Sequence, residues 1–263
     1  MLAFFRHEWK LSFKTLLIWA LSVGGMGLMC LLLYKSMESS MADMAESFAS
    51  MGAFADAFGM STLSIATMKG YFATEIGTIH TLGSCMFAAS IATVVLSKEE
   101  DGHTAELTFT FPLARVKIIA MKYAAVFFSL ICFNVICGLC YELAFLVLGE
   151  SGFGTDFLTF MGLQLLMDVE VAAICFVISA VNKKNRLGIG IAVALVLYVF
   201  DLMVRLIPDL KDAIFLSPLS YANATTIFSG AEIEKAALIF GIAVAVVMTA
   251  VAGMIYAKRD LAS

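Results

Sequence analysis

Six separate runs of 20 to 26 mostly apolar residues constrain this chain more than any other feature of its sequence. An α-helix needs about 20 such residues to cross roughly 30 Å of hydrocarbon, at about 1.5 Å of rise per residue. Strands of an outer-membrane barrel alternate in polarity over about 10 residues, and these runs do not alternate. The sequence therefore predicts an all-α, polytopic membrane protein with six transmembrane helices. The predicted spans are Thr15–Tyr34, Ile76–Ser97, Tyr123–Leu148, Phe157–Val181, Leu187–Ile207 and Ala236–Ala257.

Composition and charge agree with this class of protein. Hydrophobic residues make up 61% of the 263 residues and charged residues only 14%, against about 25% charged in a soluble domain. The net charge of −4 disfavours nucleic acid as a partner, because there is no basic excess to neutralise phosphates. Placing both termini in the cytoplasm puts twelve Lys and Arg residues inside and five outside, as the positive-inside rule requires. We therefore expect one transmembrane domain over residues 1–263, with both termini cytoplasmic.

The longest segment outside the predicted spans is an outer segment over residues 35–75. Its apolar side chains, including Met41, Met44 and Phe48, recur at helical spacing, with acidic residues mostly on the other faces. This pattern is typical of an amphipathic helix that either continues the first span or lies on the outer membrane surface. The Met/Phe stripe either packs on neighbouring helices or forms an adaptable lining for an amphipathic passenger. A copper site is disfavoured, because no His or Cys is nearby.

Residues 98–122 form the largest predicted cytoplasmic loop. Gly102, Thr104 and Glu106 are typical of a turn that leads into a short helix, which Pro112 should end. Leu107 and Phe111 stand four residues apart, so one face of that helix would present two apolar side chains to a groove on another protein. A solvated connector is the alternative interpretation of the same residues.

Charged residues inside the predicted spans are the next candidates for function. Asp168 and Glu170 lie near the middle of the fourth span, where a carboxylate is costly unless it is protonated, paired or in contact with water. Their side chains point about 200° apart on a helix, so they serve different sites. Lining of a transport path, polar packing between helices and a proton relay all remain open for them. Glu142 lies near the outer end of the third span, and Asp201 and Arg205 have the spacing of a helical ion pair.

The small and sulfur-containing residues of the spans are interpreted as packing residues rather than as catalytic or metal-binding residues. All six cysteines lie in the apolar runs, including the pair Cys137-Gly-Leu-Cys140, where thiolates form poorly. The sequence thus predicts neither a disulfide framework nor a metal site. His80 stands alone on an apolar face and is interpreted as a packing residue. Gly24-Gly25-x-Gly27 and Gly188-x-Gly190 permit close approach of helices.

A family resemblance rests on the loop. Glu99-Glu100-Asp101-Gly102-His103-Thr104-Ala105-Glu106-Leu107, followed by Phe111-Pro112-Leu113-Ala114-Arg115 and Lys122, resembles the permeases of type-2 (ABC-2) ATP-binding-cassette exporters. That family has an acidic pair, then Gly-Thr-x-Glu-Leu, then Pro and Arg; His103 is an insertion here. An amphipathic N-terminal helix over residues 1–14, Leu216-Ser217-Pro218 and the closing Lys258-Arg259-Asp260-Leu261 also agree, so the resemblance covers the whole chain.

The resemblance implies a type-2 exporter fold with a division of labour. The loop at 98–122 would form a coupling helix that docks on a separate cytoplasmic ATPase subunit, and Asn182–Arg186 would make a second contact. Two permease subunits, with spans one and five near their interface, would enclose a path driven by two ATPase subunits in a bacterial plasma membrane. The implied ATPase-coupling residues are Glu99, Glu100, Gly102, Thr104, Glu106, Leu107, Phe111, Pro112, Arg115, Lys183 and Lys184.

Members of this family move lipids, glycans, drugs or amphipathic peptides, including cytolytic toxins such as phenol-soluble modulins. The Met/Phe-rich outer segment favours a peptide as the substrate here. The candidates for contact with the path or with substrate are Asp168, Glu170, Glu142, Met41, Met44 and Phe48.

The absence of a nucleotide motif supports the same division independently. A phosphate loop needs Gly-x-x-x-x-Gly-Lys followed by Ser or Thr, and the only Lys-Ser/Thr pairs are Lys14-Thr15 and Lys35-Ser36, without the glycines. We expect a non-catalytic subunit that binds no cofactor, with ATP and Mg²⁺ on the partner. Two other functions compete: a self-sufficient secondary transporter or channel coupled through Asp168 and Glu170, and an intramembrane enzyme, whose usual motifs are missing.

Overall fold

The computed structural model describes residues 2–52, 55, 58–60, 62–103 and 114–259, and every regular element in these ranges is a helix. The all-α fold class is therefore confirmed. The elements are α1 (Leu2–Ala49), α3 (Met68–Tyr71), a π-helical turn (Phe72–Ile76), α4 (Gly77–Val94), α5 (Lys98–Asp101), α7 (Arg115–Leu148), α8 (Thr155–Val181), α9 (Leu187–Leu206), a 3₁₀ segment (Pro208–Leu216), α10 (Ala224–Ser229) and α11 (Lys235–Lys258).

Six helical stretches of the described residues are long and apolar enough to cross a membrane. The second of these stretches is the continuous helix formed by α3, the π-helical turn and α4; the other five are α1, α7, α8, α9 and α11. Each stretch contains most of one predicted run, in the predicted order. The prediction of six spans is confirmed. Three of these helices extend far beyond their apolar runs. Helix α7 begins eight residues before Tyr123, the α3–α4 helix begins eight residues before Ile76, and α1 extends beyond both ends of Thr15–Tyr34.

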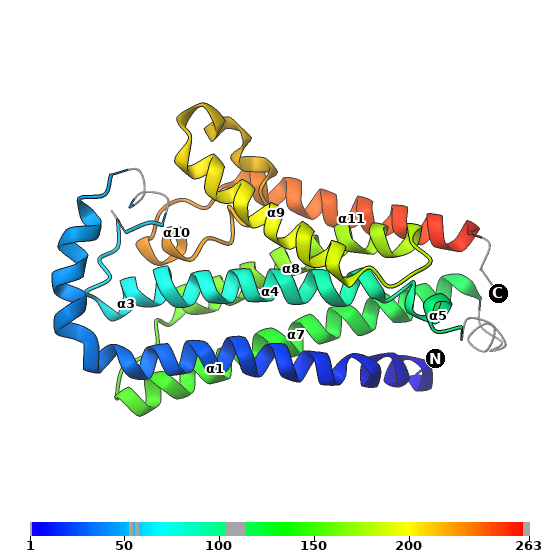
Figure 1. Cartoon of the computed structure of the whole chain (residues 1–263), viewed down its shortest axis with the longest axis horizontal. Helices are drawn as coiled ribbons and strands as arrows, with labels where there is room; N and C mark the ends of the chain where they lie inside the picture. Colours follow the sequence, from blue (N-terminus) through cyan, green and yellow to red (C-terminus); the bar gives the residue numbers. More distant parts are fainter. Residues whose placement is uncertain (1, 53–54, 56–57, 61, 104–113, 260–263) are drawn as a thin grey trace.

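Helix α1 joins three segments that the sequence analysis treats separately. It contains residues of the predicted N-terminal helix, the whole first span and the outer segment as far as Ala49, without a break. Residues 35–49 contain neither Gly nor Pro, so nothing in the sequence stops the helix at the end of the apolar run. The first span and the first part of the outer segment are therefore one helix through Ala49. In Figure 1 the outer part of α1 turns and crosses the end of the bundle.

Helix α4 is the centre of the bundle. It packs against α1 and α7 on one side and against α8 and α9 on the other, while α1 pairs mainly with α7 and α8 with α11 (Figure 1). Most residues of α4 are buried, and many of them are Gly, Ala, Ser, Thr or Cys. Small side chains let neighbouring backbones approach closely, which drives helix association in a membrane. By contrast, α9 and α11 expose much of their apolar surface.

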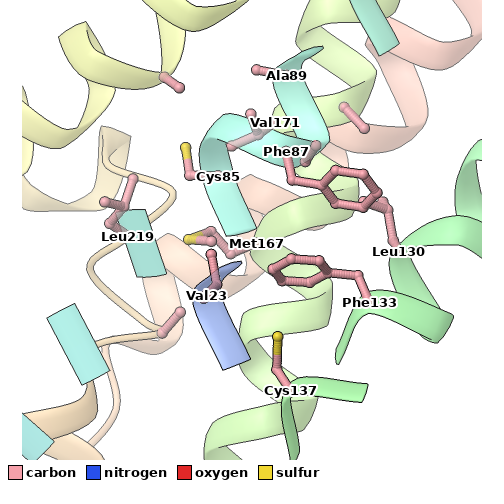
Figure 2. Close-up of a cluster of buried hydrophobic side chains, with 14 of the residues drawn as sticks. Val23, Cys85, Phe87, Ala89, Leu130, Phe133, Cys137, Met167, Val171 and Leu219 are labelled. Carbon is pink, nitrogen blue, oxygen red and sulfur yellow. The ribbon is translucent and has the colours of Figure 1, made fainter. Parts of the chain in front are cut away.

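The buried core joins the first four spans. Figure 2 shows Val23 of α1, Phe87 of α4, Phe133 of α7 and Met167 of α8 converging on one cluster. The rings of Phe87 and Phe133 stack with their centroids 4.8 Å apart. Cys137 is fully buried in the same cluster and its sulfur lies 3.7 Å from the carbonyl oxygen of Ala20, which is a packing role.

The glycine motifs act within the chain. A Cβ atom on Gly27 of α1 would collide with the ring of Tyr141 on α7, and one on Gly190 of α9 would collide with Thr93 on α4. Gly27 and Gly190 therefore permit close helix approach, as predicted, and the helices they bring together are α1 with α7 and α9 with α4.

Gly27→Leu is expected to lower the free energy of unfolding in detergent by about 1–3 kcal/mol, because an overpacked core must shift its side chains. Gly25→Leu is the matched control, since a Cβ atom there meets nothing within 4 Å. Thermal unfolding followed by fluorescence-detected size exclusion measures both variants. Equal midpoints for the two would contradict the close approach of α1 and α7.

Candidate functional site

The short helix α5 and the first residues of α7 lie at the end of the bundle that holds both chain termini, called here the terminal end (Figure 1). Helix α5 ends at Gly102, whose backbone N–H donates to the carbonyl of Lys98 over 3.0 Å. The inserted residue His103 adopts a positive φ of 52°. Five predicted coupling residues lie outside the described residues: Thr104, Glu106, Leu107, Phe111 and Pro112.

Glu99 of α5 is paired with the α1·α7 side of the bundle. Its carboxylate accepts a hydrogen bond from the ammonium group of Lys122 on α7, and the Lys122 side chain is fully buried. The same ammonium lies 3.5 Å from the carboxylate of Glu8 on α1 and donates to the carbonyl of Val95 over 2.9 Å. Lys98 adds a second ion pair to Glu8 at 2.6 Å.

Glu100, the next residue, is paired with the other side of the bundle. Its carboxylate accepts from the guanidinium of Arg259, directly after α11. Arg259 also donates to the carbonyls of Ala180 and Asn182 at the end of α8, over 2.5 and 2.9 Å. Burial lowers the pKa of Arg259 from its ordinary value, a cost that the buried Glu100 carboxylate offsets.

We call Glu8, Lys98, Glu99, Glu100, Lys122 and Arg259 the ionic cluster. Three acidic and three basic side chains make it neutral, as a buried group of charges must be to persist. Through Lys122, Glu99 connects α5 to the helix pair α1 and α7. Through Arg259, the adjacent Glu100 connects α5 to the helix pair α8 and α11. A displacement of α5 would therefore pull on both helix pairs.

The remaining predicted coupling residues lie around this cluster. Arg115 is exposed at the start of α7 and donates to the carbonyls of Ala257 and Arg259 over 3.4 and 3.1 Å. Lys183 and Lys184 are exposed in the connection from α8 to α9, directly after the carbonyl of Asn182 that Arg259 binds. Glu99 and Glu100 differ from these residues because their carboxylates are buried within the chain. Any part they play in coupling is therefore indirect.

The two carboxylates of α8 face different neighbours, as their angular separation predicts. Asp168 is fully buried and accepts from the side-chain amide of Asn134 on α7 over 2.9 Å. Asn134 in turn lies 3.4 Å from His80, whose other ring nitrogen is 3.0 Å from the hydroxyl of Tyr141. This buried polar row joins α4, α7 and α8, and each ring nitrogen of His80 faces a polar partner within it.

Glu170 points toward the last span. Its carboxylate accepts from the hydroxyl of Tyr221 over 2.8 Å, and a Cβ atom on Gly241 of α11 would collide with it. Both α8 carboxylates thus make polar contacts between elements in this structure. The predicted ion pair of Asp201 and Arg205 is also formed, at 2.8 Å.

The other path candidates lie near the opposite end of the bundle. Glu142 on α7 is half-buried, with its carboxylate against Gly152. On α1, Met41 is buried and Met44 is 42% exposed, so only Met44 of these two is accessible. Phe48 belongs to α1, and its side chain lies outside the described part of the chain.

Sequence analysis missed Glu8, Lys98, Lys122 and Arg259 as members of one cluster. The sequence signal was present in part, because Lys122 and Arg259 belong to two motifs of the resemblance and Glu8 is the only acidic residue of the predicted N-terminal helix. The pairing was not visible, since Glu8 and Lys98 are 90 residues apart and Glu100 and Arg259 are 159 apart.

The six described helices of membrane-spanning length and composition define a multi-pass membrane protein. The sequence model of the family described as "ABC-2 family transporter protein" matches residues 2–261. The chain therefore belongs to the ABC-2 transporter family and is a transmembrane permease of an ABC transporter, as the resemblance predicts. No curated protein matches the chain.

Lys122→Met is expected to lower the free energy of unfolding by about 3–5 kcal/mol, because it removes the buried cation that lies between Glu99 and Glu8. Lys117→Met is the matched control, since Lys117 is exposed on the same helix. Adding Glu8→Gln and Glu99→Gln to Lys122→Met should recover part of the loss. Thermal unfolding in detergent checks the series, and a midpoint for Lys122→Met equal to that of Lys117→Met would contradict burial of the pair.

Proposed function

We propose that this chain is the membrane permease subunit of an ATP-binding-cassette exporter, in which α5 passes the movement of an ATPase subunit to the transmembrane helices. The pairing of Glu99 and Glu100 with opposite sides of the bundle carries this proposal. A force applied to the segment that follows α5 reaches α1 and α7 through Lys122, and α8 and α11 through Arg259. Because the bonds are short and buried, the force is transmitted through charged contacts that water does not screen.

The power source is a separate polypeptide. The family is that of ABC transporters, which implies an ATP-binding partner, and the sequence has no phosphate loop of its own. In the proposed assembly two ATPase subunits bind ATP and Mg²⁺, two copies of this chain form the path, and this chain itself is not catalytic. The terminal end faces the cytoplasm of a bacterial cell, which the distribution of Lys and Arg supports.

The proposed substrate is an amphipathic peptide. Support comes from α1, which carries the Met-rich stripe out of the apolar run and across the end of the bundle (Figure 1). Met44 is accessible there, and a flexible thioether side chain adapts to varied apolar surfaces. Charged residues near that stripe, such as Asp43 and Glu46, are exposed, which suits a substrate with a polar face.

Glu106→Ala and Phe111→Ala are each expected to uncouple the transporter while leaving membrane insertion intact. The chain is purified gently from its native membrane, and ATP hydrolysis is assayed in the purified material. The expected result is that an ATPase co-purifies with the wild-type chain. In both variants, either this ATPase no longer co-purifies or its ATP hydrolysis no longer drives transport. Asp209→Ala, an exposed change in the 3₁₀ segment away from both the loop and the Met-rich stripe, is the matched control. Unchanged hydrolysis and transport in both loop variants would remove the loop from the mechanism.

The competing hypothesis of a self-sufficient transporter requires the carboxyl group of Asp168 for coupling, whereas the exporter hypothesis does not. Its buried hydrogen bond with Asn134 favours a packing role, and an amide oxygen accepts that bond as well as a carboxylate does. Asp168→Asn is therefore expected to keep most of the transport rate, measured as ATP-dependent movement of a fluorescent amphipathic peptide in inverted vesicles. Loss of transport in Asp168→Asn, together with sensitivity to a protonophore, would favour a proton relay instead.

A further inference from the structure

A groove of about 550 Å³ opens between α7, α8 and α11 on the side of the bundle. Its volume lies within the range of about 300–1,000 Å³ of ligand sites. The lining is almost wholly apolar, with Val116, Tyr123 and Phe127 from α7, Ala173 and Phe176 from α8, and Gly253 from α11 among its residues. We infer that this groove binds one acyl chain of an anionic phospholipid whose headgroup lies at Arg115 and Lys117.

The length and position of the groove fit one leaflet of the bilayer. Val116 in the first turn of α7 and Leu130 are the first and last residues of α7 that line the groove. At about 1.5 Å per residue these two positions are roughly 21 Å apart along the helix, and half of the hydrocarbon core is about 15 Å thick. The groove therefore runs from the headgroup level at the terminal end toward the middle of the membrane, as an acyl chain does.

Two contacts of Tyr123 connect the three helices that line the groove. The rings of Tyr123 and Phe176 stack in parallel with their centroids 3.5 Å apart, which joins α7 to α8. The hydroxyl of Tyr123 donates to the carbonyl of Thr249 on α11 over 3.3 Å. A Cβ atom on Gly253 would meet nothing within 4 Å, so the α11 wall recedes at that residue.

The charge at the mouth decides which lipid the groove takes. Arg115 is exposed, and its guanidinium bonds to the carbonyl of Ala257, one helical turn beyond Gly253, which places a positive charge across the open end. Lys117 is also exposed and lies one turn before Ala120 of the lining. No acidic side chain is among the described residues that line the groove. Two cations at headgroup level favour a phosphate that carries a net negative charge.

The test is photolabelling of the full chain in phosphatidylcholine vesicles. One sample contains a small fraction of phosphatidylglycerol with a diazirine on its acyl chain, and the other contains phosphatidylcholine with the same diazirine chain. Adducts are mapped by mass spectrometry. With phosphatidylglycerol, labelling of Tyr123 and Phe127 should exceed that of Leu139 and Leu146, exposed residues of the same helix, several-fold.

Two sets of variants separate the groove from the mouth. Gly253→Leu fills the groove and should reduce its labelling several-fold. Gly162→Leu should not, because Gly162 is an equally open helical glycine of α8 outside the groove. In the double variant Arg115→Gln with Lys117→Gln, the phosphatidylcholine probe should label the groove as it does in the wild type. Labelling of the groove by the phosphatidylglycerol probe should fall to that same level.

Three results would overturn the inference. One is labelling spread evenly over the apolar residues of α7, which would make the groove ordinary lipid-facing surface. Another is equal labelling in Gly253→Leu and Gly162→Leu. The third is protection of the groove by a second copy of the chain, detected as crosslinks between two copies at Phe127, which would assign the surface to a dimer.

Discussion

The organisation of the terminal end depends on the rule that a charge buried in a protein must be paired. Lys122 has no exposed surface, so Glu8 and Glu99 must lie beside it, and this requirement fixes α5 against α1 and α7. Arg259 imposes the same requirement on Glu100 and also satisfies the carbonyls that end α8. A helix of four residues is not stable by itself, so α5 depends on contacts with the rest of the protein. The ion pairs supply those contacts.

Within the membrane, polar and close steric contacts replace the hydrophobic effect as the source of specificity. Lipid tails are as apolar as Leu, so helices gain no selectivity from burying apolar surface alone. The row from Tyr141 through His80 and Asn134 to Asp168 selects one arrangement of α4, α7 and α8. Gly27 against Tyr141 does the same for α1 and α7. Asp168 and Glu170 likewise make their hydrogen bonds to side chains outside α8.

Helix α7 connects the two proposed activities of the terminal end. Lys122 and Tyr123 are consecutive, and side chains of consecutive helical residues point about 100° apart. Lys122 enters the ionic cluster, whereas Tyr123 lines the apolar groove and bonds to α11. Arg115 begins the same helix and binds the last carbonyls of the chain. A movement of α5 that shifts α7 would therefore also displace the α7 wall of the groove.

The sequence by itself determined the number, order and approximate limits of the spans, because hydropathy is a local property of about 20 consecutive residues. It also determined the Asp201–Arg205 pair, since partners four residues apart meet on any helix. It did not determine whether α1 continues beyond the apolar run, because an amphipathic pattern fits both a continued span and a separate helix on the membrane surface. Only the tertiary structure decided that Glu99 and Glu100 point inward to different helices. Their partners lie 23 and 159 residues away, and only the packed bundle brings such distant residues together.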